Sequence, residues 1–127
     1  MTTRKTSAAV GKAWTTNEQR VLILAYNAMR NADTIGHKYS KAAINRFLRG
    51  DHNTSTQYDR DAECARLIGL YIDDAEALAA RSRGSVEAKL MNISGARETL
   101  GLPILKGYKP APNFQRSLVD LVKQLER

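Results

Sequence analysis

Apolar side chains recur three and four residues apart along most of this chain, and that spacing limits its fold more than any other feature. Such a stripe forms one face of an α-helix, whereas a half-buried strand requires strict alternation. Residues 16–31 carry the stripe Val21, Leu22, Leu24, Ala25, Ala28 and Met29. The runs VLILAY and LIGLYI could form strands in isolation, but their neighbours continue the helical period. The sequence therefore predicts an all-α protein.

Polar residues that cap helices stand where the first apolar stripes begin. Thr15, with Glu18 three residues later, has the form of a capping box for the helix over 16–31. Ser40 is expected to cap a second helix, which ends at Gly50. The buried face of this second helix is predicted to consist of Ile44, Phe47 and Leu48.

The middle of the chain carries a weaker helical pattern. From about residue 57 one stripe contains Tyr58, Ala62, Ala65, Ile68 and Ile72. A short acidic helix is expected over 74–80. Together these predict an acidic helical segment over 51–80, placed between the second helix and the next strongly capped one.

Two further helices are predicted near the end of the chain. Ser82 is expected to cap a helix over 82–100, stopped by Gly101 and Pro103. Its apolar side would consist of Val86, Leu90, Ile93 and Leu100. Asn113 is expected to cap a last helix with the apolar face Phe114, Leu118, Leu121, Val122 and Leu125. That face could pack on the core, or a part left over could support a homodimer.

Length and charge indicate one small basic domain. The 127 residues suit a single domain, predicted over 14–127, preceded by a flexible basic arm over 1–13. Residues 1–50 hold nine basic and two acidic side chains, and residues 81–116 hold seven basic and two acidic ones. Between these two basic regions, residues 51–80 hold two basic and seven acidic side chains. Proteins with a net charge of +7 most often meet nucleic acid, an acidic protein or an anionic membrane.

No arrangement of residues in the sequence predicts catalysis, a metal or a cofactor. His37 and His52 lack a partner at ligand spacing and are expected in solvated loops, and Cys64 is expected near the core. We therefore expect no enzyme. Neither a leader peptide nor a bilayer-spanning run is visible, and one cysteine suits a reducing compartment, so a cytoplasmic protein without membrane contact is expected.

The start of the 82–100 helix is the strongest candidate for binding phosphate. A helix N-terminus offers free N–H groups and a favourable dipole, and Arg81 and Arg83 flank the Ser82 cap. Lys89 follows two turns later. Asn92 and Arg97 could reach base edges if they face outward, since both side chains can form paired hydrogen bonds there. The alternative is a solvated basic face on a structural helix.

Several short motifs resemble known DNA-binding modules. Trp14-Thr15 followed by Glu18 resembles the first helix of Myb/SANT-like helix-turn-helix modules, where a tryptophan packs in a three-helix core. The sets W-T-x-x-E, Y-S-K-A, R-S-R-G-S-V-E-x-K-x-x-N-I-S, G-L-P and G-Y-K-P-A-x-N-x-Q resemble a module found upstream of HNH nuclease domains in bacterial restriction-type proteins.

The resemblance implies double-stranded DNA binding by the 82–100 helix, with Val86, Leu90 and Trp14 in the core. The predicted DNA-binding residues are Arg81, Arg83, Ser85, Lys89, Asn92, Arg97, Lys106 and Lys109. No nuclease part is visible, so a small regulator or a restriction- or mobile-element-related protein without cleavage is expected. The acidic insertion over 51–80 departs from the pattern. It could shield the DNA surface, extend the core or bind another protein, and the last option makes a protein-interaction module the alternative function.

Overall fold

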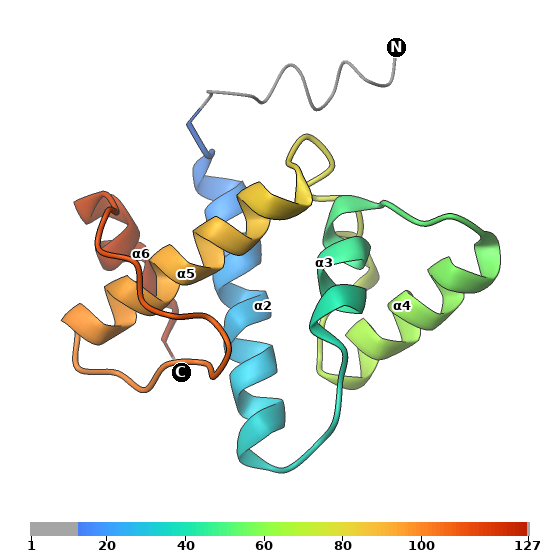
Figure 1. The fold of residues 1–127 in the computed structure, drawn as a ribbon, viewed down its shortest axis with the longest axis horizontal. Coiled ribbons are helices and arrows are strands. Elements are labelled where there is room, and N and C mark those ends of the chain that lie inside the picture. The colour runs from blue at the N-terminus through green and yellow to red at the C-terminus, as the bar shows by residue number, and fades with distance from the viewer. Residues whose placement is uncertain (1–12, 127) are drawn as a thin grey trace.

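The computed structural model describes residues 13–126, which form a small all-helical domain (Figure 1). Its elements are α2 (Thr16–Thr34), α3 (Lys41–Arg49), α4 (Ser55–Leu67), the 3-10 turn η1 (Ile72–Asp74), α5 (Arg83–Thr99) and α6 (Arg116–Leu125). Within this range no strand is present, so the predicted all-α class is confirmed. The predicted arm over 1–13 lies, apart from its last residue, outside the described part of the chain.

Side-chain caps fix where four of the helices begin. Thr15 and Glu18 form the predicted capping box, with each backbone N–H donating to the other's side chain at 2.9 and 3.1 Å. In the same way Ser40, Thr54 and Ser82 each accept the backbone N–H three residues later. Gly50 ends α3 in the left-handed conformation with φ 66°, as its position in the sequence predicts.

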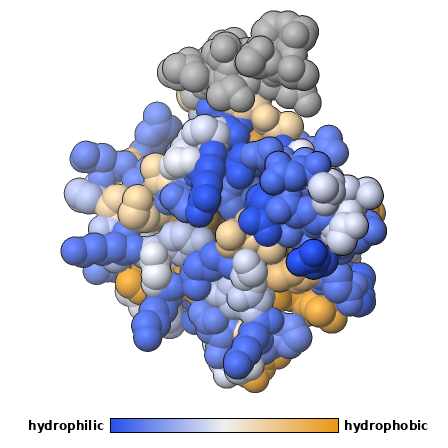
Figure 2. Space-filling model, turned by 45° about the vertical axis from the view of Figure 1, so that its right-hand side comes forward, coloured by the Kyte–Doolittle hydropathy of each residue, from blue (hydrophilic) through white to orange (hydrophobic). Residues whose placement is uncertain are grey.

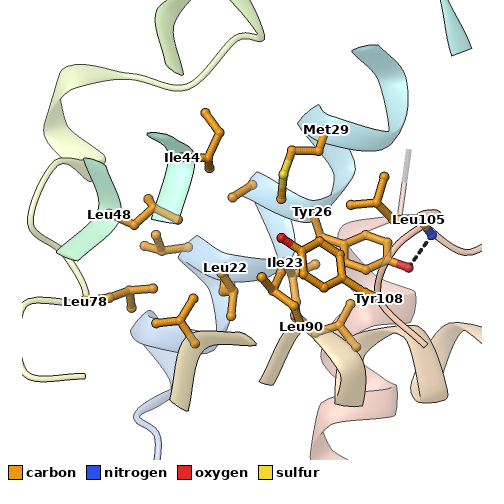
Figure 3. Close-up of a cluster of buried hydrophobic side chains, with 14 of the residues drawn as sticks. Leu22, Ile23, Tyr26, Met29, Ile44, Leu48, Leu78, Leu90, Leu105 and Tyr108 are labelled. Carbon is orange, nitrogen blue, oxygen red and sulfur yellow. Dashed lines mark hydrogen bonds between the residues drawn. The ribbon is translucent and has the colours of Figure 1, made fainter. Parts of the chain in front are cut away.

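The core is built around α2, which lies between two pairs of helices. In Figure 1, α3 and α4 lie on one side of α2, while α5 crosses it and α6 packs on α5. Tyr26 of α2 is buried, and its hydroxyl oxygen accepts the backbone N–H of Leu105 at 2.6 Å (Figure 3). The same hydroxyl lies 2.7 Å from Oγ of Ser94. One buried tyrosine therefore joins α2, α5 and the loop after α5.

The second half of α5 passes through the interior of the protein. Five consecutive residues, 93–97, are buried, so no side of the helix faces solvent there. Gly95 is in close contact with the loop that follows, because an added Cβ would lie 2.1 Å from the carbonyl oxygen of Ala111. Val86 and Leu90 are buried as predicted. Exposed residues remain at both ends of the helix, with Arg83 and Gly84 at its start and Glu98 and Thr99 at its end.

The segment after α4 differs from the sequence prediction. The helix ends at Leu67, Gly69 takes φ 98°, and Ile72, expected on a buried stripe, is 62% exposed. The helix predicted over 74–80 is absent, because backbone N–H groups of Glu76 and Leu78 donate to carbonyl oxygens at the end of α3. These bonds hold the segment across α3 in a series of turns.

The acidic segment 51–80 is part of the core. Ala65, Leu70 and Leu78 are buried in the main apolar cluster, so the segment extends the core, one of the three roles considered for it.

The last helix begins later than predicted. α6 is preceded by Gln115, whose side chain makes no capping bond, and Asn113 is not its cap. The helix buries Leu118, Leu121 and Val122, and it packs on α2 and α5. The apolar face considered for a homodimer is therefore used within the chain. Among the helices of residues 13–126, none is long and apolar enough to cross a membrane.

Candidate nucleic-acid interface

Arg81, the first predicted DNA ligand, is a structural residue. It is 7% exposed, and its guanidinium donates to both carboxylate oxygens of Glu18 at 2.7 and 3.0 Å. It also donates to the carbonyl oxygen of Ala13 at 3.0 Å and lies 4.9 Å from the ring centre of Trp14. A side chain held in this way joins α2 to α5, and it does not face outward as DNA contact requires.

Arg97 is also a structural residue. Its exposure is 0%, and its Nε donates to the carbonyl oxygen of Pro103 at 2.6 Å. The guanidinium pairs with the Glu126 carboxylate and lies 5.6 Å from the ring centre of Tyr26. Arg97 therefore does not face outward, the condition on which its contact with base edges depended, and both Arg97 and Arg81 lie outside the candidate interface.

The exposed start of α5 keeps the remaining predicted residues near the surface. The Arg83 side chain is 66% exposed, and its only ion pair in the described residues is with Glu87 at a long 3.5 Å. Lys89 is half-buried with Nζ 5.3 Å from the Trp14 ring centre; burial lowers the pKa of Lys89, and Arg81 lowers it further. Ser85 and Asn92 are partly exposed. Arg83 is thus the fully accessible cation of this helix end.

The loop after α5 brings further cations beside the same helix end. Lys106 and Lys109 are exposed on either side of Tyr108. Nζ of Lys41, at the start of α3, lies 5.9 Å from the Tyr108 ring centre. Burial raises the pKa of Tyr108 to about 12, with a further rise from Glu87 and an opposing effect from Arg83, both in the first turns of α5. We refer to Lys41, Arg83, Lys106 and Lys109 as the Tyr108 face.

A second basic feature adjoins this face. A cavity of about 250 Å³ is lined by Ala42, Arg46, Arg49, Asp51, Asn53, Gln57 and Arg83. The sequence prediction missed Lys41, Arg46 and Arg49. Arg46 and Arg49 lie in the last turn of α3, where cations also complement the helix dipole, so their positions in the sequence do not by themselves indicate binding.

His52 is buried, contrary to the prediction of a solvated loop. Its side chain is 9% exposed, and Nδ1 lies 3.1 Å from Oδ2 of Asp61, which also accepts from Arg46. Nε2 is buried without a hydrogen-bond partner, and the Tyr58 ring packs edge-on at 4.9 Å. The imidazole is therefore packed between Asp61 and Tyr58. His37 is only partly exposed, and Cys64 is partly buried near the core as expected. In the described part of the chain no cluster of three acidic, histidine or cysteine side chains could hold a metal ion.

Comparison of the chain with protein-family models, curated proteins and solved structures gives no match. Its function must therefore be inferred from its own residues.

Proposed function

We propose that the protein binds double-stranded DNA through the Tyr108 face and the exposed first turns of α5. The observation that carries the proposal is the position of Arg83. Arg83 is the first residue of α5, its side chain is largely exposed, and it lines one cavity with Arg46 and Arg49 of α3. A helix N-terminus surrounded by cations attracts phosphate oxygens, and recognition helices read bases with their N-terminal residues.

Charge and sequence motifs support the same proposal. The formal charge of +7 favours a polyanionic partner. The Arg81–Lys89 segment resembles the third, DNA-contacting helix of Myb/SANT-like modules, although its first arginine is buried inside the protein. The proposed role is a small regulator or a restriction-related binding protein without nuclease activity.

The proposal is tested by retention of a mixed pool of DNA duplexes at low salt, followed by sequencing of the retained fragments. Retention that falls steeply with salt supports the proposal, because released counterions dominate protein–DNA affinity. Failure to retain any duplex at low salt contradicts it.

A specific observation also favours the alternative, a protein-interaction module. At the end of α4 the side chains of Leu67, Tyr71 and Ile72 are 51%, 76% and 62% exposed. A groove of about 310 Å³ beside them is lined by Phe47, Asp59, Ala62, Glu63, Arg66, Leu70, Tyr71 and Ile72. Figure 2 shows one face of the molecule, which is mostly hydrophilic, with small hydrophobic patches mainly toward its lower part.

Clustered exposed apolar side chains with acidic neighbours suit a basic, amphipathic protein segment. If this alternative is correct, Ile72→Asp abolishes binding of a cationic amphipathic helical peptide. The neighbouring variant Asp73→Asn, which removes a negative charge but no apolar side chain, weakens binding only slightly. Equal binding by wild type and Ile72→Asp contradicts the alternative.

A further inference from the structure

The cavity between α3, α4 and α5 brings three guanidinium groups together. Arg46 and Arg49 come from the last turns of α3, and Arg83 is the first residue of α5. The Arg49 side chain is only 9% exposed, whereas those of Arg46 and Arg83 are 32% and 66% exposed. One cation is thus fixed at the base of the cavity, and a more mobile one stands at its rim.

Each guanidinium keeps donors that the protein does not use. Arg46 gives Nε and Nη2 to Asp61, and Arg49 gives Nε to Asn45 and Nη1 to Asp51. A guanidinium has five N–H donors, so Nη1 of Arg46 and Nη2 of Arg49 remain for a ligand. Asp51 is the only carboxylate among the lining side chains, and it is 65% exposed. The lining therefore carries a net positive charge.

Two helix N-termini meet at the same cavity. Gln57 lies in the first turn of α4 and Arg83 in the first turn of α5, and both line the cavity. In α4 the N–H of the lining residue Gln57 is used by the Thr54 cap, whereas in α5 the Ser82 cap accepts only the third N–H, so the N–H of the lining residue Arg83 has no helical partner. The positive ends of two helix dipoles add to the charge of the arginines.

From this arrangement we infer that the Arg46–Arg49–Arg83 cavity is a binding site for one phosphate group, the phosphodiester of a DNA backbone. Paired N–H donors of arginine match phosphate oxygens, and helix N-termini favour the same anion. The cavity is smaller than the roughly 300–1,000 Å³ typical of drug-sized ligands, which suits a single tetrahedral group. Arg83 belongs to both surfaces, so a strand that crosses the Tyr108 face continues into the cavity. The choice of DNA as the phosphate source rests on the proposed function.

The test is a titration of the full chain with inorganic phosphate at constant ionic strength. Binding is monitored by NMR through the chemical shifts of the backbone amides. Saturable shifts are expected for residues 49–57 and 83–85. Arg83→Ala should weaken phosphate binding about tenfold, the effect of losing one hydrogen bond to a charged group. Asp51→Asn should tighten binding, because it removes the lining carboxylate and releases Nη1 of Arg49. Lys123→Ala, exposed on α6, is the matched control and should bind like wild type.

Non-saturable shifts, or equal phosphate affinity in Arg83→Ala and Lys123→Ala, overturn the site. An Asp51→Asn affinity at or below that of wild type also counts against it.

A second titration with a short DNA duplex separates the phosphate sources. Displacement of inorganic phosphate by the duplex, with shifts at the same amides, supports the inference. Duplex binding that shifts the amides of 83–85 but leaves those of 49–57 unmoved overturns the inference and leaves the proposed function standing. Phosphate binding without any duplex binding overturns DNA as the source and the proposed function together, while the phosphate site remains.

Discussion

Arg81 and Glu18 form a two-bonded ion pair, although 63 residues separate them in the sequence. Their side chains are only 6% and 12% exposed. Glu18 also closes the capping box of α2, so one carboxylate both begins α2 and ties it to the residue before the cap of α5. The position of the exposed α5 terminus therefore depends on a buried charge pair.

Replacement of Arg81 tests this structural role. Removing one partner of a buried ion pair leaves the other charge unpaired, so Arg81→Ala should lower the free energy of unfolding by about 3–5 kcal/mol. Arg83→Ala, two residues away and largely exposed, should change it by no more than about 0.5 kcal/mol. Urea denaturation measures both. Equal stability of the two variants would show that Arg81 is not needed for the fold.

The two glycines of α5, Gly84 and Gly95, allow the packing of the helix to be tested with the same substitution at an open and at a crowded position. At Gly95 a Cβ would lie 2.1 Å from the Ala111 carbonyl oxygen and 2.8 Å from the Phe114 ring. Gly95→Ala should therefore cost about 1–3 kcal/mol through overpacking. At Gly84 no atom lies within 4 Å, so Gly84→Ala should stabilise the protein by up to about 1 kcal/mol through helix propensity. Thermal unfolding measures both changes in stability, which should have opposite signs. Destabilisation by both variants would contradict this packing.

Stability at acidic pH should depend on Asp61. Burial raises the pKa of this carboxyl, but hydrogen bonds from Arg46 and His52 outweigh burial and hold the pKa below its ordinary value of 3.8. A depressed folded-state pKa gives stability that is present above pH 3.8 and is lost as the pH falls through the lower folded value.

Asp61→Asn should therefore be less stable than wild type at neutral pH and should lose less further stability on acidification. Urea denaturation at several pH values measures both effects. If the free energy of unfolding depends on pH in the same way for wild type and Asp61→Asn, the Asp61 carboxyl is not the cause of the loss of stability in acid.

Local features of the fold could be predicted from the sequence because their causes are local. The capping box at Thr15, the cap at Ser82 and the left-handed Gly50 each involve residues no more than a few positions apart. The turns over 75–80 could not be predicted, since they depend on backbone bonds to the end of α3. A composition rich in alanine and acids suggested a helix that tertiary hydrogen bonds prevent.

The candidate interface was only partly predictable for a similar reason. Arg83 and Arg97 look equivalent in sequence, yet one is exposed and the other has 0% exposure beside Glu126. The partner that buries Arg97 lies 29 residues further along the chain. Lys41 and Arg49 lie in the candidate interface because the tertiary structure brings α3, α4 and α5 together, which the sequence pattern does not show. Which cations remain free is decided by long-range pairing, which periodicity does not reveal.

The most direct test of the central claim is the salt dependence of binding to a mixed-sequence DNA duplex, measured for wild type, Arg83→Ala and Lys123→Ala. The logarithm of the affinity should fall linearly with the logarithm of salt concentration. Arg83→Ala should bind more weakly and should have a salt slope smaller by about one, whereas Lys123→Ala should match wild type. Absence of binding at low salt, or the same affinity and slope for Arg83→Ala and wild type, would contradict DNA binding at the start of α5.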